Sequence, residues 1–497
     1  MFFTTFAVCK GLKMKRIVII SALMLTFSIM AGAQAQRNIE RIIARSQALE
    51  GASVAVMAMT ASGDTLVNYD GGRMLVPAST MKLVTTGTAL HRLGPDFRFI
   101  TRIGTTGPVE DGILKGDLVI IGGGDPTLCS SDTLAKPFFP IVKKSLDKAG
   151  IKEIQGRICG DGSYFGGARE HQCWEWEDIG TYYGSGMSGL SFAKNELGIK
   201  VVPGQNPGDS LIVKQAFPKT PWLDIEYDCL TGEKGTGDLL YMYTSDFSAK
   251  AVVRGTFAQG KNAKTVRFAN KYPEYTFVHE LKENLASGGI ATNGIWASPC
   301  PFGETYDIQE VTEIGHLDSP KLADIARETN YDSDNFYAES IFRVLGKALG
   351  GDGSYESGAA AVSEVLRSLG LSGKGFKGCD GSGLSRTNLA SPSFFCHFLN
   401  AMEKSTAFES FLESIPQAGR DGTVKYRLMK LLPEQRDRIR MKSGSMGGVY
   451  CFSGYILPQE VSGEIVTFSV MTNNFTCSSG TVTSIIDEII GAIAAEL

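Results

Sequence analysis

The 497-residue sequence predicts an α+β fold in which an antiparallel sheet, flanked by helices, is interrupted by a long strand-rich insertion. Three observations support this fold class: a β-hairpin pattern near the start of the chain, two strand patterns followed by a helix at its end, and a middle region of short β-like runs. Because strand patterns of one kind stand at both ends, we expect one domain assembled from both termini.

The first part of this domain is expected over residues 36–94. Ser62-Gly63-Asp64 supplies the turn of the hairpin, and Gly94-Pro95 ends the helix that follows it. The expected elements are a helix over 38–49, strands over 52–60 and 65–69, and a helix from Ser79 to Leu93.

Residues 95–305 form the expected insertion, which we interpret as two subdomains. Short β-like runs at 118–121, 200–202 and 211–213 are separated by Gly, Pro and Asn. Glycine makes up 58 of the 497 residues, an excess that predicts many turns in the insertion and in loops.

The second part of the domain is expected over residues 306–497, where helical patterns return and two strands precede the last helix. The expected elements are helices over 321–328, 335–349 and 359–369, strands over 450–457 and 464–472, and a helix from Thr481.

Residues 1–35 have the pattern of a secretory signal peptide. Lys13, Lys15 and Arg16 form a basic start, 14 apolar residues follow, and small residues at 31–35 offer a cleavage site. The apolar stretch is shorter than the roughly 20 residues that span a membrane. We therefore expect a periplasmic protein with at most peripheral membrane association.

Composition excludes several classes of protein. A net charge of −4, which becomes −8 without the basic leader, argues against a nucleic-acid partner. The ten cysteines contain no C-x-x-C pair, and the five histidines form no H-E-x-x-H motif, so we expect neither a metal nor another cofactor. Disulfide pairing and oligomeric state do not follow from the sequence.

A serine nucleophile needs a base within reach, and residues i and i+3 lie on one face of a helix. The Ser-x-x-Lys pattern occurs three times after the leader, and each match alone has an ordinary structural explanation as a helix cap beside a solvated lysine. The pairs are Ser79/Lys82, Ser145/Lys148 and Ser191/Lys194. Ser79 is favoured because it opens an apolar helix, whose positive dipole end favours negative charge on the serine oxygen.

Two companion motifs strengthen this choice. Ser333-Asp334-Asn335 stands on a polar loop before a helix, and Lys442-Ser443-Gly444 stands before an expected strand. S-x-x-K, S-x-N and K-[ST]-G in this order are the motif set of β-lactamases and penicillin-binding proteins. A turn with a cap and an edge-strand charge explain the two companions separately, but they do not explain the common order.

With these motifs the chain resembles the class C low-molecular-mass penicillin-binding proteins of the penicillin-binding protein 4 type, which are D-alanyl-D-alanine carboxypeptidases and endopeptidases. The resemblance extends over nearly the whole chain after the leader and includes the 254 positions between Ser79 and Ser333. Other matching segments are 77–83, 116–127, 380–385 and 419–423. Serine replaces the commoner threonine in the third motif, which keeps the hydroxyl.

The resemblance implies a serine penicillin-recognising, transpeptidase-like domain and a serine-type hydrolase that acts on peptidoglycan peptides and binds β-lactams covalently. It implies Ser79 as nucleophile, Lys82 as its base, with a pKa lowered by burial and a nearby cation, and Ser333 as proton relay. Asn335, Lys442, Ser443, Gly444 and Ser445 would bind substrate, with Lys442 as the cation and the backbone of Ser445 in the oxyanion hole.

Two alternatives remain open at this point. A class A β-lactamase shares the motifs, but its E-x-x-L-N segment has only the match ending in Leu399-Asn400, with Cys396 in the place of the glutamate. A non-catalytic peptidoglycan-binding protein would account for export and for the insertion. The long spacing between motifs argues against the first alternative, and the complete motif set argues against the second.

Overall fold

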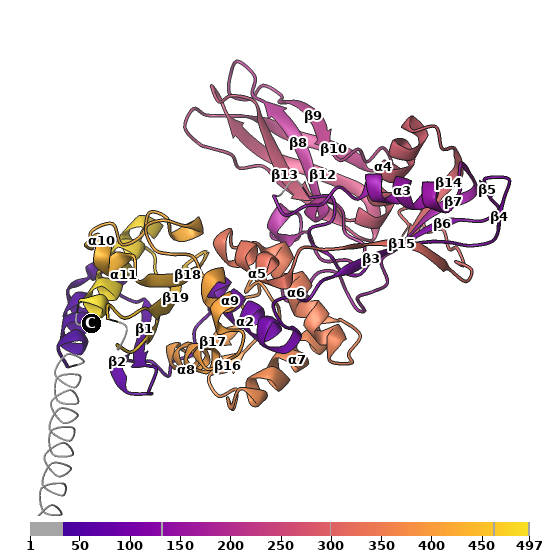
Figure 1. Cartoon of the computed structure of the whole chain (residues 1–497). Helices are drawn as coiled ribbons and strands as arrows, with labels where there is room; N and C mark the ends of the chain where they lie inside the picture. The colour runs from indigo at the N-terminus through magenta and orange to yellow at the C-terminus, as the bar shows by residue number, and fades with distance from the viewer. Residues whose placement is uncertain (1–32, 131–132, 299, 461–462, 496–497) are drawn as a thin grey trace, which may run out of the picture.

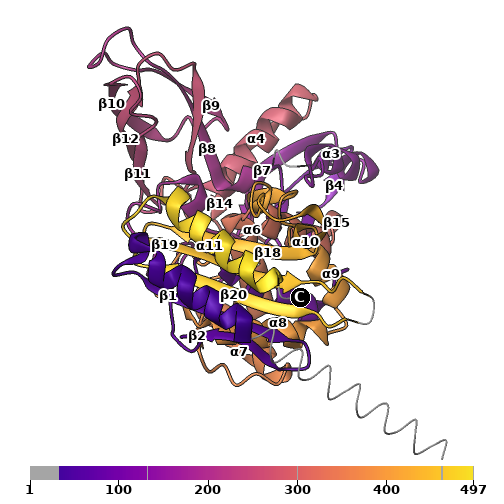
Figure 2. The same ribbon diagram turned by 90° about the vertical axis from the view of Figure 1, so that its left-hand side faces the viewer.

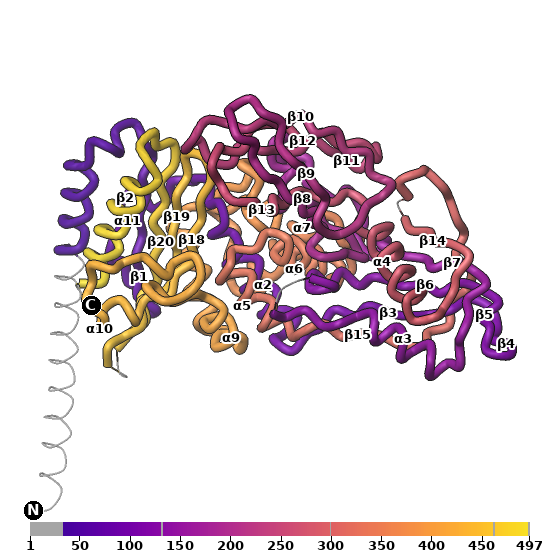
Figure 3. Tube along the Cα trace, turned by 90° about the horizontal axis from the view of Figure 1, so that it is seen from above, coloured from indigo at the N-terminus to yellow at the C-terminus, as the bar shows by residue number. Residues whose placement is uncertain are grey.

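A computed structural model describes residues 33–495 except 131–132, 299 and 461–462. All but the last three residues of the predicted signal peptide lie outside this part of the chain. The catalytic half and the inserted region form two lobes (Figure 1), and the C-terminus lies beside the N-terminal helix at the far end of the catalytic lobe (Figure 3). Within the described residues, no helix is long and apolar enough to cross a membrane.

Both ends of the chain build the central sheet, as the sequence predicts. The five strands are antiparallel, and β1 from the start of the chain pairs with β20 from its end. The order is β18 (Ile439–Met446), β19 (Val449–Ile456), β20 (Val466–Asn473), β1 (Ser53–Thr60) and β2 (Thr65–Tyr69). The α+β fold with an antiparallel sheet is therefore confirmed.

Helices cover both faces of this sheet because its strands are apolar on both sides. Val54, Val56 and Ala58 of β1 pack with the N-terminal helix (residues 33–45) and α11 (Ser479–Ala494), which lie side by side over one face (Figure 2). The opposite face packs on a helical layer that contains the first motif. Its helices are α2 (Met81–Leu93), α5 (Leu322–Tyr331), α6 (Asn335–Ala348), α7 (Tyr355–Ser368), α8 (Pro392–Glu403) and α9 (Phe408–Ser414).

The inserted region contains two hydrophobic cores. One lies under a seven-stranded mixed sheet covered by α3 (Phe139–Lys148) and α4 (Pro273–Ser287). The strands of this sheet are β3 (Ile100–Thr105), β4 (Val109–Glu110), β5 (Ile113–Leu114), β6 (Leu118–Ile121), β7 (Glu153–Asp161), β14 (Thr292–Ser298) and β15 (Thr312–Asp318).

The second core lies between two three-stranded sheets that share one set of buried side chains. One sheet has the order β10-β12-β11 and the other β13-β8-β9. The strands are β8 (Glu196–Val202), β9 (Ile212–Phe217), β10 (Asp224–Gly232), β11 (Tyr241–Ser245), β12 (Ser248–Ala258) and β13 (Lys264–Ala269).

Two sequence expectations need correction. β15 pairs with β3, so the sheet of the inserted region extends past the boundary expected at residue 305. Lys442 does not precede a strand but lies within β18. This strand escaped notice because the apolar alternation of Ile439 and Met441 ends at Ser443 and Ser445, which occupy the next positions on the same face.

Candidate active site

Ser79 lies on a tight turn at the start of α2. The turn is a short 3-10 helix, Ala78–Thr80, in which Ala78 adopts a positive φ of 45° and the Thr80 hydroxyl donates to the carbonyl oxygen of Pro77 at 2.6 Å. Ser79 is half-buried. This position at a helix N-terminus favours negative charge on the serine oxygen.

Lys82 lies one turn along α2 and is fully buried. Its Nζ donates to the Oγ of Ser79 at 2.8 Å, to the Oδ1 of Asn335 at 2.7 Å and to the carbonyl oxygen of Ser382 at 2.8 Å. Burial lowers the pKa of Lys82 to about 8, although carboxylates nearby oppose the shift. A substantial fraction of this amine is therefore neutral near pH 8 and able to accept a proton.

The second motif lies at the start of α6, directly beside Lys82. Ser333 adopts a positive φ of 58°, and Asp334 caps the helix by accepting a hydrogen bond from the backbone N–H of Tyr337 at 3.0 Å. Asn335 is the first helical residue. The motif's turn and cap therefore point Ser333 and Asn335 toward the two lysines.

Lys442, on β18, is fully buried and completes the cluster. Its Nζ donates to the Oγ of Ser333 at 2.9 Å and to the carbonyl oxygen of Ser443 at 2.7 Å. Burial lowers the pKa of Lys442 well below its ordinary value, and the charge of Lys82 lowers it further.

The expected cause of the lowered pKa of Lys82 is thus partly corrected. We expected burial together with a nearby cation, whereas burial is the largest cause and carboxylates, led by Glu339, act against it. Lys442 enters as a second buried amine whose own pKa is depressed by Lys82. Because both amines are deeply buried, one positive charge shared by Lys82 and Lys442 is more favourable than a charge on each. A carboxylate bound beside them would stabilise that charge.

Gly444 allows β18 to pass directly against the nucleophile's turn. A Cβ at this position would lie 2.6 Å from the carbonyl oxygen of Pro77 and 2.9 Å from the backbone nitrogen of Ser79. Both are main-chain atoms that cannot move aside, so only glycine permits this approach.

The flanking serines of β18 differ in their contacts. The Oγ of Ser443 lies 2.7 Å from the Oγ1 of Thr423, a residue of the segment 419–423 for which the sequence suggested no role. Ser445 has an exposed side chain and pairs with Tyr450 of β19.

Sequence reasoning missed Glu339, which is almost fully buried on α6. Its carboxylate accepts hydrogen bonds from the backbone N–H groups of Gly381 and Ser382 at 2.9 and 2.8 Å. These bonds hold the carbonyl group of Ser382, which accepts a hydrogen bond from Lys82. Burial raises the pKa of Glu339 to about 8, and Asp380 adds to the shift. The only sequence signal was the Asp-Gly-Ser-Gly segment itself, to which no role was assigned.

The inserted region contacts the second motif and the 380–385 segment. The carbonyl oxygen of Tyr183 accepts from the Nδ2 of Asn335 at 3.1 Å, and Lys194 forms a 2.7 Å ion pair with Asp334. The indole N–H of Trp174 donates to Asp380 at 3.0 Å.

The two other Ser-x-x-Lys pairs lie outside the site. Ser191 donates to the carbonyl oxygen of Ser188 at 3.1 Å, and Lys194 binds Asp334 instead. Ser145, expected on a solvated helix, is buried, and a Cβ on Gly315 of β15 would lie 2.3 Å from its hydroxyl. Of the three pairs, Ser79/Lys82 is therefore the one that the structure brings together with Ser333, Asn335 and Lys442.

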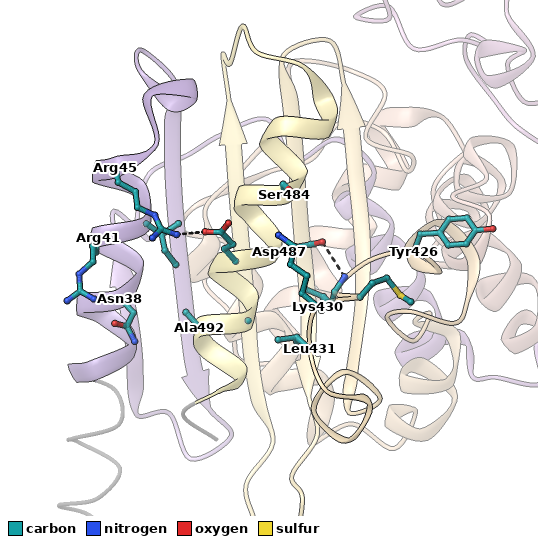
Figure 4. Close-up of a pocket in the computed structure, with 14 residues that line it drawn as sticks. Asn38, Arg41, Arg45, Tyr426, Lys430, Leu431, Ser484, Asp487 and Ala492 are labelled. Atoms are coloured by element: carbon teal, nitrogen blue, oxygen red, sulfur yellow. Dashed lines mark hydrogen bonds and ion pairs between the residues drawn. The ribbon is translucent and has the colours of Figure 1, made fainter.

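A separate pocket of about 520 Å³ lies on the opposite face of the sheet, between the N-terminal helix, α11 and the 426–431 segment (Figure 4). An ion pair of 2.5 Å joins Arg45 to Glu488 across it. None of the motif residues lines this pocket. In the part of the chain that the structure describes, no group of three His, Cys, Asp or Glu side chains could hold a metal ion.

The clustered groups can perform acyl transfer without a metal. A serine hydroxyl contacts a buried amine of lowered pKa, and a second hydroxyl, that of Ser333, contacts a second buried amine. We expect these groups to supply a nucleophile, a base and a proton path.

Comparisons with known proteins agree with this geometry. The D-alanyl-D-alanine carboxypeptidase of Actinomadura sp. (strain R39) is 28% identical over 444 residues, which cover 87% of this chain and 79% of that protein. The D-alanyl-D-alanine carboxypeptidase DacB of Haemophilus influenzae is 26% identical over 430 residues, 86% of each chain.

Solved structures show the same fold. The crystal structure of penicillin binding protein 4 (dacB) from Haemophilus influenzae superimposes with a TM-score of 0.80 at 24% identity, covering 92% of this chain and 99% of that one. The model of the D-Ala-D-Ala carboxypeptidase 3 (S13) family matches residues 35–496. Nearly the whole described chain is therefore accounted for, and the protein belongs to the D-Ala-D-Ala carboxypeptidase 3 (S13) family.

Proposed function

We propose that this D-Ala-D-Ala carboxypeptidase works through an acyl-enzyme on Ser79 and acts on both the stem peptides and the cross-links of peptidoglycan. The observation that carries the proposal is the 2.8 Å contact between the Ser79 hydroxyl and the buried amine of Lys82. A lysine at an ordinary pKa of about 10.4 would be charged at neutral pH and unable to act as a base.

In the acylation step, neutral Lys82 takes the proton of Ser79 as its Oγ attacks the carbonyl carbon between two D-alanines. Backbone N–H groups of Ser79 and Ser445 stabilise the oxyanion. The C–N bond then breaks as the leaving amine receives, through the Ser333 hydroxyl, the proton that Lys82 took from Ser79, so that Lys82 is neutral again and Ser333 keeps its hydroxyl. Water hydrolyses the ester, which regenerates Ser79 and releases the shortened peptide.

Substrate binding falls to the groups around these three residues. Lys442 attracts the terminal carboxylate, whose negative charge would favour the protonated form of this buried amine. Ser443 offers a hydroxyl to the same carboxylate, while Asn335 holds a peptide carbonyl. Gly444 keeps the strand close to the nucleophile.

The names of two similar proteins support inhibition by β-lactams. A curated relative from Dictyostelium discoideum, 24% identical over 434 residues (83% of this chain and 81% of that protein), is named a penicillin-sensitive carboxypeptidase. A crystal structure of the Haemophilus influenzae protein is described as complexed with a novel beta-lactam. Together with the predicted signal peptide, this supports a periplasmic enzyme.

The β-lactamase alternative is less well supported. The segment nearest to the lactamase glutamate motif lies in α8, where the Cys396 thiol contacts the carbonyl oxygen of Met57 and Asn400 donates to that of Thr60 at 2.8 Å. These groups pack on β1, so they are not available to activate water beside Ser79.

Labelling with fluorescent penicillin tests the proposal. The wild-type protein should become covalently labelled and should release D-alanine from a peptide ending in D-Ala-D-Ala, and Ser79→Ala should abolish both. Ser191→Ala, which alters another Ser-x-x-Lys pair, is the control. Labelling that persists in Ser79→Ala would rule out this nucleophile, and rapid repeated penicillin hydrolysis would favour the lactamase.

Cross-linked muropeptides test the endopeptidase activity. Mass analysis of the products should show monomers appearing from dimers in addition to the loss of terminal D-alanine. Loss of terminal D-alanine alone would restrict the enzyme to carboxypeptidase activity.

A further inference from the structure

Three aromatic side chains form an exposed patch on the inserted region, which we call the aromatic platform: Trp176, Tyr241 and Tyr243. Trp176 is 61% exposed, Tyr241 41% and Tyr243 36%. The rings contact one another, with centroids 6.1 Å apart for Trp176 and Tyr243 and 5.1 Å apart for Tyr241 and Tyr243. Contiguous exposed rings of this size usually mark a binding surface.

The platform is held rigidly by the sheet beneath it. Tyr241 and Tyr243 alternate along β11 with Met242 and Thr244, which are buried. Met242 belongs to the core shared by the two three-stranded sheets. The two tyrosines therefore project from the outer face, and their exposure is not a consequence of a loose loop.

Polar groups stand beside the rings on the same sheet face. Arg254 of β12 is opposite Tyr241, and Asp228 of β10 is opposite Arg254, with which it forms an exposed 3.2 Å ion pair. The pair carries no net charge but offers both donors and acceptors of hydrogen bonds.

This combination fits a neutral carbohydrate. The C–H bonds on one face of a pyranose ring carry partial positive charge and are attracted to the negative face of an aromatic ring. Its hydroxyl groups require donors and acceptors at the edge of the same surface, which Arg254 and Asp228 supply. Glu226 of β10 is opposite Val252, which is opposite Tyr243, so this exposed carboxylate adds a negative charge to the same face and disfavours an anionic ligand.

The segment 176–183 joins the platform to the motif residues around Lys82. It begins at Trp176, passes β11 at Gly180, where a Cβ would lie 1.7 Å from the carbonyl oxygen of Met242, and reaches Tyr183. The Tyr183 carbonyl oxygen receives the hydrogen bond of Asn335, which contacts Lys82. A polymer bound on the platform would therefore lie close to the cleft.

We propose that the aromatic platform binds the glycan strand of peptidoglycan while the stem peptide of the same strand enters the cleft. The inference rests on the proposed function, because it is the peptidoglycan substrate that joins such peptides to a chain of amino sugars. The platform then selects polymeric wall material over free peptides and takes no part in bond cleavage.

The test uses the full-length protein and a variant with Tyr241→Ser and Tyr243→Ser. Tyr227→Ser is the matched control, because Tyr227 is 38% exposed on the same sheet but pairs in register with the buried Val253 and so belongs to the inner face. Binding is measured with neutral oligomers of N-acetylglucosamine, because glycan strands stripped of their peptides carry free lactyl carboxylates, and D-alanine release is measured with intact sacculi and with a free D-Ala-D-Ala peptide.

The double variant should bind glycan about tenfold more weakly and release D-alanine about tenfold more slowly from sacculi. Its rate with the free peptide should match wild type, because neither tyrosine lies in the cleft, and the control variant should behave as wild type throughout. Unchanged glycan binding would overturn the proposal and point to a protein partner, and an equal loss with both substrates would reduce the platform to a structural role.

Failure of the proposed function would look different. A wild-type protein that neither takes up penicillin nor cleaves the free peptide could still bind the neutral oligomers, because that measurement involves no reaction. The two inferences are therefore separable.

Discussion

The side chains of the motif cluster around Ser79 and those of the aromatic platform differ in their exposure to solvent. Lys82 and Lys442 are completely buried, and burial lowers the pKa of both. Trp176 of the platform is 61% exposed. Exclusion of water thus lowers the pKa of the two lysines, whereas the aromatic platform presents its side chains to solvent, where a large ligand can reach them.

The two regions meet at the second motif. The inserted region supplies Lys194, which forms an ion pair with Asp334. It also supplies the Tyr183 carbonyl oxygen, which accepts a hydrogen bond from Asn335. It supplies neither the nucleophile nor its base. We therefore expect changes in the cleft to abolish the reaction and changes in the inserted region to adjust it.

The largest effect is expected from Lys82→Ala. Loss of the base should slow acylation by penicillin about 10²- to 10⁴-fold, the usual range for general base catalysis. Stopped-flow or gel-based labelling measures this rate. Lys148→Ala, at the same spacing from Ser145 in the inserted region, is the control and should acylate normally. A normal rate in Lys82→Ala would mean that another group is the base.

A second large effect is expected from Gly444→Ala. The new Cβ would meet main-chain atoms of Pro77 and Ser79, so β18 must move away from the nucleophile. A displacement of this kind should cost about 10²-fold in acylation, with the fold retained by circular dichroism. The control is Gly447→Ala, where a Cβ meets only the flexible end of Arg386 at 3.2 Å. Equal rates in the two variants would contradict the close-approach argument.

The pH dependence of acylation tests the environment of Lys82. Only the neutral amine accepts a proton, so the rate should rise with pH and level off above a midpoint near the pKa of about 8. Glu339→Gln removes the carboxylate that most strongly favours the charged amine, so the midpoint should move to lower pH.

The same variant loses one of the two backbone hydrogen bonds to Gly381 and Ser382, because an amide nitrogen cannot accept. Its stability should fall by about 1–3 kcal/mol, which thermal unfolding measures. A midpoint that stays at 8 or moves upward would show that Glu339 does not act on Lys82 through its charge.

The smallest effect is expected from Lys194→Met in the inserted region. Without its partner, the Asp334 carboxylate acts more strongly on Lys82 and raises its pKa. Acylation at neutral pH should fall severalfold, and the midpoint should move to higher pH, the direction opposite to Glu339→Gln. Lys264→Met, which breaks the exposed 2.7 Å pair with Asp238, is the control and should change neither.

The catalytic lobe could be predicted from the sequence more fully than the inserted region. Its apolar helices and strands follow simple periodicities, and the predicted hairpin strand 65–69 coincides with β2. In the inserted region α4 went unrecognised, although Phe277, Val278, Leu281 and Leu285 have helical spacing, because the surrounding short strands dominated the interpretation.

Site prediction worked where the chemistry is local in sequence. Ser79 and Lys82 lie one helical turn apart, so their contact follows from spacing. Glu339 acts through Gly381 and Ser382, more than 40 positions away, and no local pattern signals such a contact. Lys194 appeared only as part of a weak motif, and its pairing with Asp334 depends on how the two lobes fold together.

The pairing of β1 with β20 has a consequence for the order of synthesis. The ribosome makes Ser79 and Lys82 early, whereas Lys442 and β20, which pairs with β1 on the side away from β2, come late. An incomplete chain therefore carries a nucleophile without its second cation and without a finished sheet to support it. We therefore expect a chain that ends before β18 to lack hydrolytic activity.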